Sequence, residues 1–481
     1  MGSNKNITNG LKPDLPSPSE RGTRGEVVIA IFDIGKTNKK LLLFDEHYKV
    51  VHEESRQLDE TKDEDGFACE DVELLTQWVT DSFETLLKDD RFQIKAVNFS
   101  AYGASFVYLD KDLKVIPPLY NYLKPFAPAL QKKFYKDYGG ESRVSKETAS
   151  PVLGNLNSGM QLYRLKYEKP EVFATIKYAL HLPQYLCFLL SGMLHTDITS
   201  IGCHTNLWDF QEKQYHDWVK QEGIAEKFAP VLKSNAKAGH TAKKIPVGGG
   251  LHDSSSALIP YLASFHEPFI LLSTGTWCIT LNPFNHSQLS DLELHQDCLC
   301  YLSYEGNPVK ASRLFAGYEH EQQTKRLAAF FKLPEDHYKT VECDQKIIDQ
   351  LELGKAFTKK GADDVMIQQS VFAKRDLKKF KNYEQAYHQL IADIITQQLY
   401  STNLVLKGTP VKRIFVDGGF GKNPIFMHMM ADVFPGIEVY AASVAQASAL
   451  GAALVMHEHW NKKVLPTDII ELKYYSEQQK R

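Results

Sequence analysis

Two strand–turn–strand patterns, one near the start of each half of the chain, constrain the fold more than any other feature of the sequence. In the first, the polar segment Asp33–Lys40 lies between the apolar runs Val27–Phe32 and Leu41–Phe44. In the second, Ser273–Thr276 follows the apolar run Phe269–Leu272 and precedes another apolar run. Apolar runs of this length, joined by polar turns that contain glycine, are typical of buried strands paired as hairpins. The repeated pattern indicates two similar domains that face one another, each of which offers a turn to the same ligand.

The composition agrees with two globular domains and argues against some classes of function. The 481 residues are 43% hydrophobic and 24% charged, which suits two domains with full cores. The formal net charge is −3, so the chain lacks the basic footprint of a nucleic-acid-binding protein. The best candidate for a membrane span, Tyr178–Leu190, is interrupted by His181, Pro183 and Gln184. We therefore expect neither a nucleic-acid partner nor a membrane partner.

The cysteines and the N-terminal residues indicate the cellular compartment. The seven cysteines are scattered, and Cys298 and Cys300 are too close in sequence for the usual zinc-ligand spacing. We expect all seven to be reduced thiols in a cytoplasmic protein. Residues 1–25 are polar, are rich in Ser, Pro, Gly and Asn, and lack the apolar core of a signal peptide. We expect this segment to be a disordered tail outside the fold.

A glycine-rich stretch near the middle of the chain, Val247–Leu258, presents a candidate catalytic carboxylate. Three consecutive glycines precede Leu251, His252 and Asp253, and a helix-like apolar run follows. Glycines leave the neighbouring backbone groups open, so a carboxylate held on such a turn is well placed to act as a base on a hydroxyl group. Asp253, Ser254 or Ser255 could instead serve only as the cap of the following helix.

The polar turn Asp33–Lys40 has the residue types of an anion-binding turn. Small turn residues can expose consecutive backbone N–H groups, and Lys36, Lys39 and Lys40 add positive charge. Asp33, at the end of the preceding strand, is placed to hold a hydrated Mg²⁺ ion. The alternative is an ordinary hairpin with a solvated basic turn.

A third glycine-containing segment, Asp417–Asn423, indicates a nucleotide cradle. It follows the buried-type strand Val411–Val416 and precedes a helix predicted over Pro424–Phe434. Glycines allow a base or ribose to lie against the main chain, and a helix N-terminus favours phosphate. The segment matches neither the GxGxxG fingerprint nor the P-loop.

Four further segments complete the predicted organisation. Gly103 lies between the predicted strands Ile94–Phe99 and Phe106–Leu109, where a glycine marks either a close ligand or a plain bend. The polar residues of Arg313–Gln322 line either a cleft or a solvated surface. The small residues of Ser443–Leu454 predict a helix packed tightly against a sheet. Further helices are predicted over Val72–Leu87, Leu162–Lys169, Tyr178–Leu190 and Asn382–Leu406.

Taken in order, these motifs resemble those of the FGGY family of carbohydrate kinases, within the actin/hexokinase/Hsp70 superfamily. The resemblance covers about residues 26–470. It implies an α/β fold of two ribonuclease-H-like domains with a cleft between them, here an N-terminal domain over 26–243 and a C-terminal domain over 244–481. It also implies ATP and Mg²⁺ as cofactors, a small sugar as substrate and a homodimer as a common assembly.

The resemblance assigns a role to each matching position. Asp253 becomes the catalytic base, for which an ordinary pKa near 4 is sufficient, and Asp33 and Asp253 become Mg²⁺ ligands. The first phosphate turn supplies Gly35, Lys36, Thr37, Asn38, Lys39 and Lys40. The second supplies Thr274, Gly275 and Thr276, and the adenosine motif supplies Gly418, Gly419 and Asn423. Tyr102, Gly103, His252, Asp253 and Ser254 are the implied sugar-binding residues.

Within the family, two motifs resemble rhamnulokinases. His252-Asp253-Ser254 is similar to their His-Asp followed by a small hydroxyl residue, and Tyr102-Gly103 is similar to their aromatic-Gly pair. The implied substrate is L-rhamnulose, phosphorylated on O1, in rhamnose metabolism; L-fuculose and the pentuloses xylulose and ribulose are the alternatives. Lys36 and Asn38 depart from the small residues usual in the first turn.

Two alternatives of other classes are less consistent with the sequence. A non-catalytic sugar or nucleotide sensor of the same fold would have no need of Asp253. A nucleotide switch like Hsp70 or actin would need a peptide-binding domain or filament surfaces, for which little chain remains after the nucleotide motif.

Overall fold

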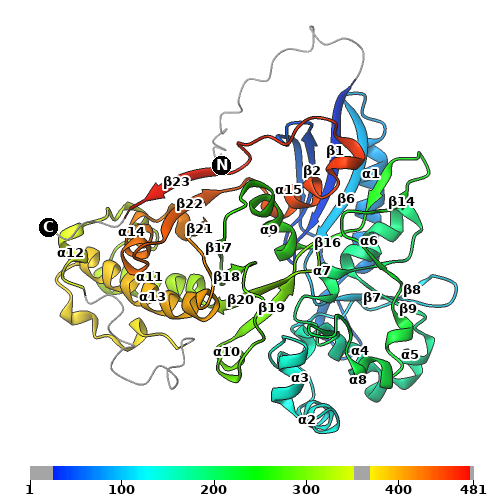
Figure 1. The fold of residues 1–481 in the computed structure, drawn as a ribbon, viewed down its shortest axis with the longest axis horizontal. Coiled ribbons are helices and arrows are strands. Elements are labelled where there is room, and N and C mark those ends of the chain that lie inside the picture. Colours follow the sequence, from blue (N-terminus) through cyan, green and yellow to red (C-terminus); the bar gives the residue numbers. More distant parts are fainter. Residues whose placement is uncertain (1–24, 352–368, 477–481) are drawn as a thin grey trace, which may run out of the picture.

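The core of the protein consists of two seven-stranded sheets that lie side by side in the computed structural model, which describes residues 25–351 and 369–476 (Figure 1). The first sheet contains β1 (Glu26–Ile34), β2 (Lys39–Asp45), β3 (Val50–Arg56), β6 (Phe92–Ala101), β14 (Lys237–His240), β15 (Pro246–Gly248) and β16 (Leu251–His252). The second contains β17 (Phe269–Thr274), β18 (Cys278–Asn282), β19 (Cys298–Leu302), β20 (Pro308–Leu314), β21 (Arg413–Gly418), β22 (Glu438–Ser443) and β23 (Glu471–Tyr475). Of the predicted tail, residues 1–24 lie outside the described residues.

The first sheet brings three distant segments to one edge. β1 and β2 form the predicted antiparallel hairpin. β6 runs parallel to β1, with Ser100 beside Asp33, and β16 runs parallel to β6, with His252 beside Ala101. Because these three strands are parallel, their C-terminal ends lie next to one another along the same side of the sheet.

The second sheet repeats this arrangement. β17 and β18 form the second predicted hairpin, with Thr274 opposite Cys278. β21 runs parallel to β17, with Gly418 beside Thr274, and β22 runs parallel to β21. In each sheet, therefore, an antiparallel triplet (β3-β2-β1 or β20-β18-β17) continues into parallel strands. The internal repeat expected from the two turns is present in the structure.

β15 and β16 belong to the first sheet, although they follow residue 243. Val247 of β15 pairs with Val97, and Leu251 of β16 pairs with Ser100. The predicted domain boundary between residues 243 and 244 remains a prediction. The chain leaves the first sheet after β16 and enters the second sheet at β17.

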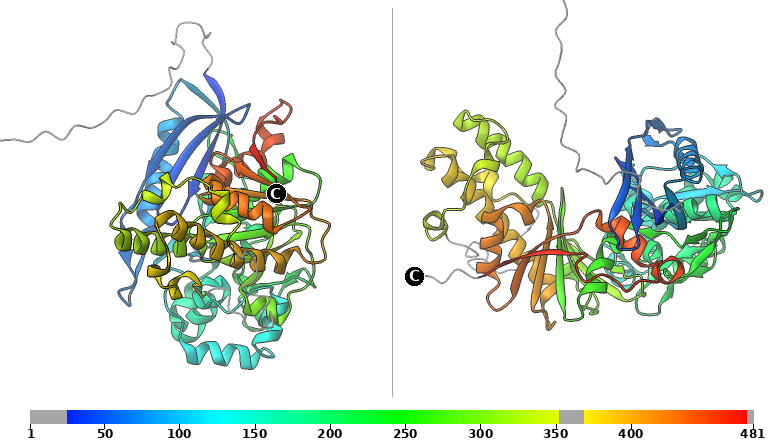
Figure 2. Two further views of the ribbon diagram at one scale, coloured as in Figure 1. Left: turned by 90° about the vertical axis from the view of Figure 1, so that its left-hand side faces the viewer. Right: turned by 90° about the horizontal axis from the view of Figure 1, so that it is seen from above.

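The helices lie on both sides of the sheets and between them (Figures 1 and 2). They are α1 (Val72–Leu86), α2 (Pro128–Asp137), α3 (Glu141–Glu147), α4 (Ser158–Glu168), α5 (Pro170–Thr175), α6 (Leu182–Ser191), α7 (Ile198–Ile201), α8 (Asp217–Gln221), α9 (Asp253–Ser264), α10 (Asp291–His295), α11 (Ala316–Phe331), α12 (Gln345–Ile348), α13 (Tyr383–Leu406), α14 (Pro424–Val433), α15 (Ala447–Leu454) and α16 (His457–Trp460). The remaining strands are short: β4 (Glu60–Lys62), β5 (Ala68–Glu70), β7 (Phe106–Leu109), β8 (Val115–Ile116), β9 (Tyr178–His181), β10 (Thr196–Asp197), β11 (Trp208–Asp209), β12 (Gln214–Tyr215) and β13 (Val231–Leu232).

α9 and α15 cross closely in the layer between the two sheets. A Cβ atom at Gly451 of α15 would lie 1.9 Å from the carbonyl oxygen of Ser256 in α9, so only glycine allows this approach. The hydrophobic cluster around them joins Ile29 of the first sheet to Leu271 of the second. The small residues of α15 therefore pack against a helix as well as against β1 and β6.

Two predicted helices begin later than expected. Tyr178–His181 forms strand β9, which pairs with β7, and α6 starts at Leu182 with Pro183 in its first turn. In the first case strand pairing prevails over an apolar run that also suits a helix. In the second, strand β22 (Glu438–Ser443) takes only Ser443 of the predicted helix, and α15 starts at Ala447 after Gln446, whose backbone is left-handed at φ +55°.

All seven cysteines are free thiols, and six of them are buried. Among the described residues, no helix combines the length and the apolar character that a membrane span requires.

Candidate active site

Asp253 is the first residue of α9 and lies where β16 ends, at the shared edge of the first sheet. Its Oδ1 accepts a hydrogen bond of 2.6 Å from the backbone N–H of Ser254 and lies 3.2 Å from His252 Nε2. Although 36% of the side chain is exposed, the surrounding protein raises the pKa of Asp253 to about 6, chiefly because burial disfavours the charged carboxylate. An ordinary pKa near 4 would be sufficient for the predicted base, and the raised pKa makes Asp253 a stronger base than an ordinary aspartate.

Asp253, Ser254 and Ser255 were proposed as possible helix caps, but none of them occupies the N-cap position of α9. The N-cap position is occupied by His252, and no side chain accepts a capping hydrogen bond there. Asp253 instead bonds to the N–H of the next residue, which fixes its carboxylate at the helix N-terminus. The orientation of Asp253 is thus set locally, by α9 itself.

Asp33, at the end region of β1, lies in the same site as Asp253. Its Oδ2 accepts a hydrogen bond of 2.8 Å from the hydroxyl of Ser448 in α15. The pKa of Asp33 is raised to about 6 by burial, lowered in part by Ser448 and raised further by the negative charge of Asp253. Two carboxylates that repel one another in this way are hard oxygen donors suited to Mg²⁺. The residues present fit the predicted metal, whose binding remains a prediction.

The structure brings the two predicted sugar motifs into contact. A Cβ atom at Gly103 would lie 2.7 Å from Cδ2 and 2.9 Å from Nε2 of His252, so Gly103 lies directly against the imidazole. His252 Nε2 lies 3.1 Å from Cys203 Sγ, and its ring stacks on Tyr301 at 5.7 Å. Burial lowers the pKa of His252 to about 3, so the ring is neutral.

Tyr102 is buried, and its hydroxyl donates a 3.0 Å hydrogen bond to Glu70 Oε2. Its ring centroid lies 6.0 Å from that of Tyr122. The pKa of Tyr122 is raised by burial and then by the charges of Asp253 and Glu70, which places Tyr122 near the predicted base. Sequence reasoning did not identify Tyr122, because it lies in an irregular loop with no motif.

The three lysines of the first turn have different partners. Lys36 pairs with Glu60, and Lys40 pairs with Glu53; all four side chains are partly exposed. Lys39 is different, since its ammonium is buried and forms an ion pair of 2.5 Å with Glu70. While that pair holds, the charge of Lys39 is directed away from solvent, so its predicted contact with phosphate does not follow from this geometry.

The second turn is tied to the glycine cradle by hydrogen bonds. Thr274 Oγ1 donates to the carbonyl of Asp417 at 2.6 Å and accepts from the N–H of Phe420 at 3.0 Å. The N–H of Gly419 donates to the carbonyl of Thr274 at 2.9 Å. Gly418 has φ +91°, and a Cβ atom there would lie 2.1 Å from the same carbonyl oxygen. The predicted phosphate and adenosine motifs thus form one continuous surface.

A cavity of about 600 Å³ opens beside this surface. It is lined by the predicted residues Thr274, Gly275, Gly419 and Asn423, and its size and apolar walls suit a nucleoside. Phe420 and Lys422 of the predicted cradle also line it, as do Gly317 and His320 of the segment Arg313–Gln322. Sequence reasoning missed the remaining walls, which come from α13, the segment before α12 and the start of α14: Tyr338, Lys339, Val341, Tyr387 and Pro424.

Asn423 has a structural task as well as a place in the cavity wall. Its Oδ1 accepts hydrogen bonds from the N–H groups of Ile425 and Phe426, which caps α14. Its Nδ2 donates to the hydroxyl of Tyr387 at 2.8 Å, and that hydroxyl lies 3.0 Å from His320 Nε2. Burial lowers the pKa of His320 to about 4, so this wall of the cavity is uncharged.

The segment Arg313–Gln322 was predicted to line either a cleft or a solvated surface, and the structure places its residues in different surroundings. The Arg313 guanidinium binds both carboxylate oxygens of Asp297, at 2.6 and 3.0 Å, and lies 5.4 Å from the ring of Trp277. Burial raises the pKa of the Cys203 thiol next to His252, and the charge of Arg313 partly opposes that rise. Further along, His320 lines the nucleoside-sized cavity, whereas Gln322 is exposed.

Comparisons with known proteins identify the family of the chain. Residues 28–260 match the N-terminal domain of the FGGY family of carbohydrate kinases, and residues 266–464 match the C-terminal domain. The chain is 20% identical over 456 residues to a rhamnulokinase of Mannheimia succiniciproducens, covering 88% of each chain. It is 24% identical over 454 residues to a probable L-xylulose kinase of Pasteurella multocida, covering 89% of this chain and 90% of that one.

Solved structures share the fold at low sequence identity. A carbohydrate kinase from Novosphingobium aromaticivorans superimposes with a TM-score of 0.74 and 20% identity over 95% of both chains. A ligand-bound xylulose kinase from Lactobacillus acidophilus gives 0.74 and 18% over 94% of both. The predicted fold of two ribonuclease-H-like domains is thereby confirmed. Since the two family domains together span most of the chain, this protein belongs to the FGGY family of carbohydrate kinases and is a phosphotransferase that acts on a sugar hydroxyl group.

Proposed function

We propose that this kinase transfers the γ-phosphate of ATP to O1 of L-rhamnulose. The observation that carries the proposal is the contact between Gly103 and His252, which joins the Tyr102-Gly103 and His252-Asp253-Ser254 motifs beside an exposed part of Asp253. Relatives named rhamnulokinase support the same sugar, and the family implies ATP as the phosphate donor.

In this reaction Asp253 is the base. A bond forms between the sugar O1 and the γ-phosphorus while the bond from that phosphorus to the bridging oxygen of ADP breaks. The proton of the sugar hydroxyl passes to Asp253. A pKa of about 6 leaves the carboxylate ionised at neutral pH and makes it a better acceptor than an ordinary aspartate.

The two turns position the phosphates. The N–H groups of Gly35 and Gly275 close the two turns by donating to the carbonyls of Asn38 and Trp277, so the phosphates would bind the other N–H groups of each turn. Lys36 and Lys40 can exchange their exposed carboxylate partners for phosphate oxygens. Mg²⁺, when bound, neutralises charge on the phosphate oxygens. Asp33 and Asp253 would hold it, and bound cation would favour the ionised form of both carboxylates.

The nucleoside-sized cavity supports the adenosine assignment. Gly419 is open toward it, since a Cβ atom there would meet only the Thr274 carbonyl oxygen, at 3.9 Å. Aromatic side chains of Tyr338, Tyr387 and Phe420 offer apolar surface to a base. We place the activity in the cytoplasm, where free thiols persist, and retain a homodimer as the expected assembly.

Other sugars are the first alternatives. L-Fuculose and the pentuloses xylulose and ribulose differ from L-rhamnulose only in stereochemistry or at the end of the chain remote from O1. Relatives named probable L-xylulose kinase favour a pentulose as the second candidate. A non-catalytic sensor is the alternative of another class, and the presence of both Asp33 and Asp253 argues against it.

A coupled assay of ADP release tests the proposal. It compares L-rhamnulose, L-fuculose, L-xylulose, D-xylulose, L-ribulose and D-ribulose, each with and without Mg²⁺. We expect the specificity constant for L-rhamnulose to exceed the others by at least about a hundredfold, because a site that hydrogen-bonds the substrate hydroxyls rejects analogues that leave its polar groups unpaired. Another ketose in first place would contradict the substrate. Absence of turnover with all six, together with ATP binding, would favour the sensor.

A further inference from the structure

The buried ion pair between Lys39 and Glu70 is part of a longer series of contacts. Lys39 Nζ lies 2.5 Å from Glu70 Oε1, and the two side chains are only 2% and 3% exposed. Lys39 Nζ also donates to the backbone carbonyl of Lys36 at 3.1 Å. The other oxygen of Glu70, Oε2, accepts from the hydroxyl of Tyr102 at 3.0 Å. Both oxygens of the carboxylate therefore have partners in different parts of the site.

One end of the series lies in the first phosphate turn. The carbonyl of Lys36 points inward to the Lys39 ammonium, while the N–H of Gly35 closes the turn by donating to the carbonyl of Asn38 at 2.9 Å. Thr37 and Asn38 are exposed at the tip. A carbonyl held inward leaves the N–H groups of the turn as the polar groups that face an anion.

The other end lies on the sugar side. Tyr102 precedes Gly103, which contacts the imidazole of His252. The backbone N–H of Tyr102 also donates to the carbonyl of Ile34 at 3.0 Å, immediately before the turn. Any ligand that fixes Tyr102 and Gly103 therefore also constrains Glu70.

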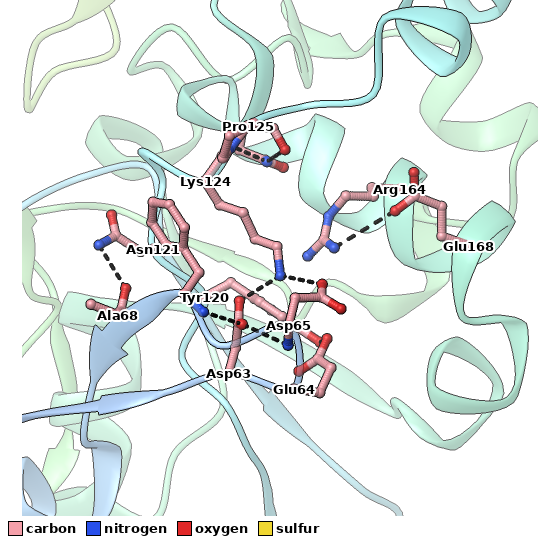
Figure 3. Close-up of polar contacts among 12 residues, drawn as sticks. Asp63, Glu64, Asp65, Ala68, Tyr120, Asn121, Lys124, Pro125, Arg164 and Glu168 are labelled. Atoms are coloured by element: carbon pink, nitrogen blue, oxygen red, sulfur yellow. Dashed lines mark hydrogen bonds and ion pairs between the residues drawn. The ribbon is translucent and has the colours of Figure 1, made fainter.

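A second cluster nearby, centred on Lys124, holds the adjoining loop in a similar way (Figure 3). Lys124 Nζ lies 2.5 Å from Asp63 Oδ2 and 2.6 Å from Asp65 Oδ2. Glu64 accepts a hydrogen bond from the hydroxyl of Tyr120 at 2.8 Å and forms an ion pair with Lys169. Glu64 thus has the same kinds of partner as Glu70, a tyrosine hydroxyl and a lysine, but those partners are not residues of the phosphate turn.

A purely structural role would not account for this choice of residues. Burying a lysine and a glutamate costs desolvation free energy that their attraction often fails to offset, and apolar pairs of similar volume are frequently as stable. The position of Lys39, between Lys36 and Lys40 in the phosphate turn, suggests that the ion pair with Glu70 holds this turn in a defined conformation.

We propose that Glu70 is a positioning residue that couples the sugar side to the first phosphate turn through Tyr102 and Lys39. The inference rests on the proposed kinase function. A sugar bound against Tyr102 and Gly103 holds Glu70 in place, which fixes Lys39 and thereby the inward carbonyl of Lys36. Because coupling between two sites is reciprocal, sugar and nucleotide then bind more tightly together than apart.

Isothermal titration calorimetry tests this coupling. The dissociation constant of a Mg²⁺-bound β,γ-imido analogue of ATP is measured alone and with saturating L-rhamnulose, or with whichever ketose the specificity panel ranks first. We expect the sugar to tighten analogue binding by at least about fivefold in the unmodified protein. In Glu70→Gln this ratio falls below about twofold, while the affinity for the analogue alone changes by less than about threefold. Tyr102→Phe lowers the ratio as well.

Glu64→Gln is the matched control, and its ratio should equal that of the unmodified protein. If Glu70→Gln does not fold, the double variant Lys39→Met/Glu70→Gln, which removes both buried charges, is measured in its place. The inference would be overturned if sugar tightened analogue binding as much in a folded variant, Glu70→Gln or Lys39→Met/Glu70→Gln, as in the unmodified protein. It would also be overturned if the unmodified protein formed sugar phosphate but sugar tightened analogue binding less than about twofold. Failure of the proposed function is distinguishable, since no sugar of the panel would then be phosphorylated by the unmodified protein, and both proposals would fall.

Discussion

Gly103 lies in contact with His252, although the two residues belong to different motifs of the sequence. A methyl group added at Gly103 would lie only 2.7 Å from His252 Cδ2, and the ring cannot move freely because it stacks on Tyr301 and contacts Cys203. The contact makes glycine necessary at this position and fixes the surface that we assign to the sugar.

Gly103→Ala should therefore impair sugar binding. The added methyl group displaces the imidazole, which we expect to raise KM for the sugar at least about tenfold and to destabilise the fold by about 1–3 kcal/mol. Steady-state kinetics and thermal unfolding measure the two effects. Gly249→Ala is the control, because a Cβ atom there has no neighbour closer than 3.7 Å. Unchanged sugar kinetics in Gly103→Ala would refute the placement of the sugar.

The pH dependence of the rate should reflect the two carboxylates. Asp253 and Asp33 both have a pKa raised to about 6 by burial, and a protonated base cannot accept the hydroxyl proton. We expect kcat/KM for the sugar to fall in acid with a midpoint at or below the pKa of about 6, because bound Mg²⁺ favours the ionised carboxylates, and with a slope between about one and two because the two groups interact. A profile of kcat/KM from about pH 4.5 to 9 measures this. A rate that stays constant down to the acid end of that range would contradict the raised pKa values.

Asp33→Asn should stabilise the protein at high pH while it lowers activity. The folded-state pKa of Asp33, about 6, lies above its unfolded value, so its favourable contribution is present below about pH 4 and is lost as the pH rises through 6. At pH 8 the folded protein retains an unfavourable buried charge, which asparagine removes. We expect the melting temperature of Asp33→Asn to exceed that of the unmodified protein by about 1–3 °C at pH 8.

The sign of this difference is the test, and it should shrink as the pH is lowered toward 4. Melting curves in the absence of Mg²⁺ isolate the effect, because a bound cation would itself favour the ionised form. A less stable Asp33→Asn variant at pH 8 would show that the hydrogen bond from Ser448 outweighs the desolvation of the carboxylate.

Substitutions at the neighbouring glycines Gly418 and Gly419 should have different effects, one on stability and the other on nucleotide binding. Gly418 has φ +91°, and a Cβ atom there would lie 2.1 Å from the Thr274 carbonyl oxygen, so Gly418→Ala should lower the melting temperature. Gly419 is open toward the cavity, so Gly419→Val should leave the melting temperature within about 2 °C and raise KM for ATP at least about tenfold by filling nucleotide space. An unchanged KM for ATP in Gly419→Val would refute the adenosine assignment.

The two hairpins and the order of the motifs could be predicted from the sequence, because they depend on local patterns of residues. The apolar runs on either side of Asp33–Lys40 and of Ser273–Thr276 form β1–β2 and β17–β18, since buried strands bounded by glycine turns have a distinctive pattern. The long helix predicted over Asn382–Leu406 is present over Tyr383–Leu406, with Asn382 as its cap. Strand β9 was missed because an apolar run suits a helix as well as a strand until its partner is known.

The partners of the charged residues could not be predicted from the sequence. In the sequence Lys39 is one of three turn lysines, and only the fold reveals that Glu70 lies beside it and that both are buried. Ser448, which bonds to Asp33, lies in the small-residue segment Ser443–Leu454, which was expected only to pack, and Tyr122, near Asp253, lies in an irregular loop. The raised pKa of Asp253 likewise depends on burial, which arises from distant parts of the chain.

The most direct test of the account is the formation of sugar phosphate from radiolabelled ATP and L-rhamnulose by Asp253→Asn. We expect transfer to fall by about 10²–10⁴-fold, the contribution of a general base, while calorimetry shows ATP bound within about threefold of the normal affinity. Asp71→Asn serves as control, because Asp71 caps α1 and asparagine can replace it there. Transfer by Asp253→Asn within about tenfold of the unmodified protein would remove Asp253 as the base and contradict the account.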